Sequence, residues 1–131
     1  MIQSLEHSNI SATFPASLES ARSAREFVRT ELHEAGVDQL SDRLSLIASE
    51  LVTNAIVHAG SDIEVRIVID LRDVVLEVID EAEGRPRPIP PSNSETSGRG
   101  LILVDALADA WGVTEVEGGV GKMVWIRVSR N

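Results

Sequence analysis

The sequence predicts an α+β fold, a two-layer α/β sandwich with a mixed, mainly antiparallel sheet and helices on one face. Short segments of alternating apolar residues occur in pairs separated by brief turns, which is typical of hairpins. The helical segments do not separate most of the strands, so a doubly wound parallel sheet does not fit. We expect strands at 10–14, 63–70, 74–80, 113–117 and 122–128.

Three segments have the periodicity of amphipathic helices. The first is expected to run from an N-cap at Ser17 to about Ala35, where Gly36 stops it. The second ends at Gly60 and is capped by Ser41 or Asp38; its apolar stripe comprises Leu40, Leu44, Ile47, Leu51 and Ala55. The third, GLILVDALADAWG, is expected to span 100–112.

Length and composition predict one domain over residues 1–131. The formal net charge of −9 argues against a direct nucleic-acid partner, because phosphate binding relies on clustered Lys and Arg. Cysteine is absent, and no apolar run approaches the ~20 residues of a membrane span. The first ten residues do not resemble a signal peptide. We therefore expect a cytoplasmic protein without a membrane partner.

The second helix carries polar residues at a regular spacing. In ELVTNAIVHAG, Glu50 and Asn54 are four residues apart and share a helix face, at the edge of the apolar stripe. A carboxylate and an amide offer hard oxygen ligands, which suit a Mg²⁺ ion that also binds substrate phosphates. The carboxylate also offers a general base. The alternative is a solvated helix face. His58, four residues further on, fits a structural role near the helix C-terminus.

Two further motifs suit a nucleotide. Asp80 closes the strand 74–80 and could accept a hydrogen bond from a ligand amine, and Gly84 lets the chain turn beside it. The run SGRGL, 97–101, opens the third helix with bare backbone N–H groups, as in a phosphate cradle, although it is not a Walker motif. Taken singly, each has an ordinary reading, as a turn or a helix start. A long segment rich in Pro and Ser, 81–98, connects the two motifs, and a loop of this length in a compact domain is usually functional or mobile.

In this order the motifs resemble those of the GHKL ATPase superfamily, and most closely the small anti-sigma factor serine/threonine kinases. ELVTNAIVHAG resembles the N box of the family, SGRGLILVDALADAWGV its second glycine box, and GKMVWIRV its closing strand. The resemblance implies a histidine kinase-like ATPase domain of the GHKL (Bergerat) type that uses ATP and Mg²⁺.

The resemblance also implies roles for individual residues. Asn54 would bind Mg²⁺, and Glu50 would be the general base toward an attacking hydroxyl. Asp80 would bind the adenine amine, with Gly84 beside the base. The residues next to the phosphates would be Gly98, Arg99, Gly100 and Leu101, and the ATP lid would cover about 85–97.

Two positions depart from the family pattern. Ala82 replaces a glycine of the first glycine box, and Met123 stands where a threonine near the adenine is usual. The leading hypothesis is a kinase that binds a sigma factor and phosphorylates a STAS-type anti-sigma factor antagonist, so that the sigma factor is regulated by partner switching. The departures leave open a non-catalytic module that binds a sigma factor or another regulator and has weak or lost ATP binding. A homodimer through the first strand and first helix is expected by analogy.

Overall fold

Five antiparallel strands form one open sheet in the computed structural model of the chain, which describes residues 7–80, 102–115 and 121–130. The strands are β1 (His7–Phe14), β2 (Ile63–Asp70), β3 (Asp73–Asp80), β4 (Ala110–Glu115) and β5 (Lys122–Ser129). Their order across the sheet is β1-β2-β3-β5-β4. The predicted α+β sandwich is confirmed, and β3 is its central strand; every described strand pair is antiparallel, rather than mixed as expected.

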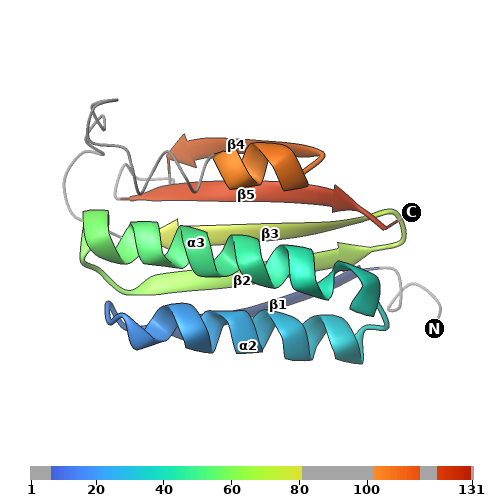
Figure 1. Cartoon of the computed structure of the whole chain (residues 1–131), viewed down its shortest axis with the longest axis horizontal. Coiled ribbons are helices and arrows are strands. Elements are labelled where there is room, and N and C mark those ends of the chain that lie inside the picture. Colours follow the sequence, from blue (N-terminus) through green and yellow to red (C-terminus); the bar gives the residue numbers. More distant parts are fainter. Residues whose placement is uncertain (1–6, 81–101, 116–120, 131) are drawn as a thin grey trace.

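Helices cover one face of this sheet (Figure 1). α2 (Glu19–Glu34) and α3 (Ser41–Ala59) pack side by side, and a short 3₁₀ helix, η1 (Asp38–Leu40), precedes α3. A further helix covers 102–107 and lies beside β4 and β5. No helix in the described residues is both long and apolar enough to cross a membrane.

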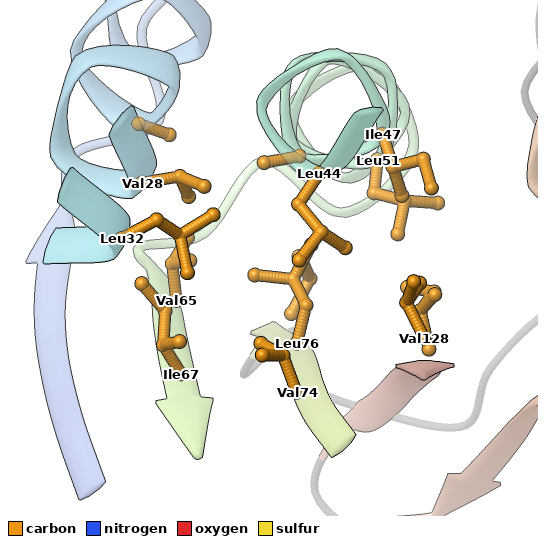
Figure 2. Packing of buried hydrophobic residues seen from close by; sticks show 14 of the residues in the cluster. Val28, Leu32, Leu44, Ile47, Leu51, Val65, Ile67, Val74, Leu76 and Val128 are labelled. Carbon is orange, nitrogen blue, oxygen red and sulfur yellow. The ribbon is translucent and has the colours of Figure 1, made fainter. Parts of the chain in front are cut away.

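The core lies between the two main helices and the sheet. Figure 2 shows Val28 and Leu32 of α2 above Val65 and Ile67 of β2, and Leu44 of α3 above Leu76 of β3. On β2, β3 and β5 the buried apolar residues alternate, as expected for strands with one covered face: Ile63, Val65, Ile67 and Ile69; Val74, Leu76 and Val78; Ile126 and Val128. We call this the helix-facing side of the sheet, and the other the open side.

The helix stops were predicted correctly, whereas the side-chain caps were not. Gly60 has φ +69 and ends α3, in the left-handed conformation that glycine adopts without strain. Ser17 lies one residue before the N-cap position of α2, Leu18, and its Oγ accepts from the Glu19 N–H at 3.3 Å. Neither Ser41 nor Asp38 caps α3, whose N-cap position is Leu40, without a side-chain hydrogen bond. The Asp38 carboxylate instead lies 2.9 Å from Nδ1 of His33.

The third helix is shorter than predicted. The described helix covers 102–107, and residues 110–112, expected to be helical, begin β4. Asp109 accounts for the difference, because it attaches the chain to β5: its N–H donates to the Arg127 carbonyl (2.9 Å) and its Oδ2 accepts from the Ser129 N–H (2.6 Å). The ladder with β5 then satisfies the backbone from Ala110 onward. The expected start at Gly100 lies outside the described residues.

Candidate nucleotide site

α3 places Glu50 and Asn54 at the edge of the helical layer. Its apolar stripe is buried against the sheet, while both polar residues are half-buried, as the sequence predicted. Residues four apart on a helix have Cβ atoms about 5–6 Å apart, so the carboxylate and the amide share one small surface.

The side-chain amide of Asn54 has an oxygen whose hydrogen-bonding capacity is not satisfied by the described residues. Its Oδ1 is buried and has no hydrogen-bond partner in the described part of the chain. A buried oxygen left without a partner costs about 1–3 kcal/mol, so this atom calls for a partner that the described residues do not supply. A hard cation or a water bound to one fits, because amide oxygens are good ligands for Mg²⁺. The residues at this position therefore suit the metal that the sequence implied.

Asp80 lies at the end of β3, on the helix-facing side. Only 4% of the residue is exposed, although the side chain is a carboxylate. In the ladder it pairs with Ile63 on one side and with Lys122 on the other. A buried carboxylate needs hydrogen bonds or an opposite charge, and one held in this way at the end of a strand is a candidate binding group.

The topology brings Asp80 to the same end of the molecule as the C-terminal half of α3. Because α3 leads through a short turn into β2, and β2 pairs antiparallel with β3, the last residue of β3 lies near the end of α3 (Figure 1). Asn54 is in the C-terminal half of this helix, and Glu50 is one turn before it. Three of the predicted site residues thus come from two packed elements. The other five, Gly84, Gly98, Arg99, Gly100 and Leu101, lie outside the described residues, as do Ala82 and the expected lid.

One expectation about the site is wrong. Met123 pairs with Ile79, not with Asp80, and successive strand residues point to opposite sides of a sheet. Met123 therefore faces the open side, and the β5 residue on the side of Asp80 is Lys122. Sequence reasoning missed Lys122, although the alternation was readable: Lys122 has the same parity as Ile126 and Val128, which are both buried under the helices.

The helix 102–107 follows directly on the glycine-containing segment and is fixed at several points. Val104 is fully buried in the core. Trp111 donates through Nε1 to Asp105 Oδ1 at 3.1 Å, and Arg43 of α3 donates through Nη1 to the Leu107 carbonyl at 3.4 Å. These contacts tie this helix to β4 and to the first turn of α3.

His58, the last polar residue of the motif ELVTNAIVHAG, is exposed in the last turn of α3, where a basic side chain interacts favourably with the helix dipole. Within the described residues, no group of three or more His, Cys, Asp and Glu side chains could hold a metal ion by itself. A metal at Asn54 would thus depend on ligands from outside this set, such as phosphate oxygens and water.

Comparisons with known proteins agree with the fold. A family model described as histidine kinase-like ATPase domain matches residues 14–128. Among solved structures, the chain is similar to the RsbU and RsbW domains of Rv1364c from Mycobacterium tuberculosis, with a TM-score of 0.67 and 24% identity. That match covers 95% of this chain and 33% of the other, so the chain spans about a third of its length. No curated protein matches.

Proposed function

Because this chain belongs to the histidine kinase-like ATPase domain family, we propose that it is an ATP-dependent serine/threonine kinase of the anti-sigma factor type. Its substrate would be a hydroxyl of a STAS-type antagonist protein, and its second partner a sigma factor, released or bound by partner switching. The observation that carries the proposal is the buried Oδ1 of Asn54, which has no hydrogen-bond partner among the described residues and lies one turn from the carboxylate of Glu50.

Glu50, Asn54 and Asp80 each have a role in this proposal. Asp80 accepts a hydrogen bond from the adenine amine. Asn54 Oδ1 is a ligand of Mg²⁺, which supplies charge neutralisation for the phosphates. Glu50 takes the proton from the attacking hydroxyl. Phosphoryl transfer depends on positioning and charge neutralisation more than on covalent chemistry. These few groups are therefore of the types that the transfer requires.

The residues outside the described range complete the proposal on the strength of the sequence resemblance. Gly98, Gly100 and Leu101 would offer backbone N–H groups to the phosphates, Arg99 would contribute positive charge, and Gly84 would lie beside the base. The lid would cover about 85–97.

The alternative, a non-catalytic module that binds a sigma factor or another regulator, rested partly on Met123. Because Met123 faces the open side of the sheet, its lack of a hydroxyl no longer argues against adenine binding. Ala82 remains as a departure from the family pattern.

Transfer of labelled phosphate tests the proposal. The protein is incubated with Mg²⁺ and γ-labelled ATP, together with the antagonist protein, and calorimetry measures ATP binding in parallel. We expect label on the antagonist, a loss of 10²-fold or more with Glu50→Gln, and unchanged ATP affinity in that variant. The control is Glu31→Gln, which replaces a half-buried carboxylate of α2 and should behave as wild type. No transfer together with weak or absent ATP binding would favour the non-catalytic module, and ATP binding without transfer would refute the kinase while keeping the nucleotide site.

A further inference from the structure

Lys122 lies at the point where β5 begins, opposite the buried carboxylate of Asp80. Directly opposed residues of an antiparallel pair have Cβ atoms about 4.5–5.5 Å apart and project to the same side. Lys122 is half-buried, and Val124, two residues further along the same side, packs against the core. Both observations place the Lys122 side chain on the helix-facing side, with Asp80.

The two ladder neighbours of Asp80 differ completely in chemistry. On β2 the neighbour is Ile63, which is fully buried and apolar. On β5 it is Lys122, the only charged group opposite Asp80 in the ladder. Within residues 7–80, 102–115 and 121–130 the Lys122 ammonium forms no ion pair, although exposed Glu115 of β4 flanks it on the other side. A hydrogen-bond donor therefore stands next to an acceptor at one rim of the candidate site.

This juxtaposition matches one edge of adenine. The exocyclic amine at position 6 is a donor, and the adjacent ring nitrogen N1 is an acceptor. A carboxylate and an ammonium in neighbouring positions are the complementary pair. We propose that Lys122 determines base recognition together with Asp80, by donating to N1 of adenine while Asp80 accepts from the amine. This inference rests on the proposed nucleotide site.

An ordinary structural reading is that Lys122 only balances the negative charge of Asp80 or Glu115, or attracts the triphosphate. These readings predict an effect of Lys122 on every nucleotide alike. Donation to N1 predicts an effect only on bases that have this acceptor, so the two can be separated by changing one atom of the ligand.

The experiment measures the affinities of wild type and Lys122→Met for ATP and for the ATP analogue in which N1 is replaced by C–H. Wild type should bind ATP about tenfold more tightly than the analogue, as expected for one charge-assisted hydrogen bond. In Lys122→Met the two ligands should bind equally. Met123→Thr is the matched control on the open side and should keep the wild-type ratio. Thermal unfolding of each variant establishes that it is folded.

One result would overturn the inference while leaving the nucleotide site intact: an unchanged ratio of the two affinities in Lys122→Met, whether both ligands lose affinity equally or neither loses any. If wild type bound neither ligand, the proposed function would itself fail, and the inference with it. Restoration of the ratio by Met123→Thr in the Lys122→Met background would also contradict the inference, since it would move the base contact to the other residue.

Discussion

The indole of Trp125 lies directly against Gly112 on the open side of the sheet. The two residues are cross-strand neighbours of β5 and β4, and a Cβ built on Gly112 would be 2.8 Å from Nε1 and Cζ2 of the ring. Real Cβ atoms do not approach other heavy atoms this closely, so the glycine is required by its neighbour rather than by its backbone conformation.

Gly112→Ala should therefore destabilise the protein by about 1–3 kcal/mol, because the half-buried indole must shift and lose its contacts. Urea denaturation measures the change in the free energy of unfolding. The control is the same substitution in a Trp125→Ala background, where no ring opposes the methyl group and the cost should fall below about 0.5 kcal/mol. A cost that is equal in both backgrounds would mean that something other than the ring excludes a side chain.

Arg43 should stabilise the helix 102–107 from outside. Its guanidinium donates to the Leu107 carbonyl at the C-terminal end of this helix, where backbone acceptors lack helical partners. Arg43→Met keeps most of the aliphatic stem, so we expect a loss of about 1 kcal/mol in the free energy of unfolding and faster amide exchange in 102–107.

The matched control for Arg43 is Arg29→Met, which breaks the ion pair with Asp42. Both side chains of that pair are at least half exposed, and such pairs contribute little. If the two arginine variants lost the same stability, or if exchange in 102–107 did not change, the contact with Leu107 would have no stabilising role.

The parts of the fold that were predictable from the sequence are those set by local pattern. Strand alternation fixed β2, β3 and most of β5, and the helix stop at Gly60 follows from a residue that tolerates positive φ. The helical spacing of the apolar stripe on α3 was enough to place Glu50 and Asn54 at an edge rather than in the core. These features depend on periods of 2.0 and 3.6 residues, which the chain carries in its own order.

The parts that were missed depend on contacts between distant residues. The segment 110–112 has helical character as a sequence, yet pairing with β5 makes it a strand. The register of β3 against β5 decided that Lys122, not Met123, is opposite Asp80. If a family motif is aligned one residue too far along a strand, the expected role falls on a side chain on the other side of the sheet. Only the pairing register of the strands reveals such a shift.

His33 should make stability depend on pH. Its Nδ1 lies 2.9 Å from the Asp38 carboxylate, and that hydrogen bond, followed by the charge of Asp38, raises the pKa of His33 above 6.5. A group whose pKa is higher in the folded state stabilises most fully below its unfolded pKa, and loses this contribution as pH rises through the folded pKa. The contribution should therefore be present below about pH 6.5 and decline above it.

Thermal unfolding of wild type and His33→Gln across pH 5.5–9 measures this difference. The melting temperature of wild type should exceed that of the variant most at acidic pH, and the two melting temperatures should converge at basic pH. Asp38→Asn should remove the same dependence, since the partner charge is gone. A difference that grew toward basic pH would reverse the sign and contradict the assignment. Because both side chains are largely exposed, added salt should weaken the effect.

Asn54 should trade stability for ligand binding. Its buried Oδ1 has no partner in the described residues, so replacing the amide by an apolar group of similar size removes an unsatisfied acceptor. Asn54→Leu should raise the free energy of unfolding of the nucleotide-free protein by about 1 kcal/mol, with a further contribution from the better helix propensity of leucine. The same variant should lose Mg²⁺-dependent ATP binding.

Thr53→Val is the control, because the Thr53 hydroxyl is already satisfied by the Ser49 carbonyl at 2.8 Å and its removal should give no gain. Denaturation with and without Mg²⁺ and ATP separates the two effects: wild type should be stabilised by the ligands and Asn54→Leu should not. If Asn54→Leu were less stable than wild type without ligand, the oxygen would have a partner within the protein, and the site would not be poised for a metal.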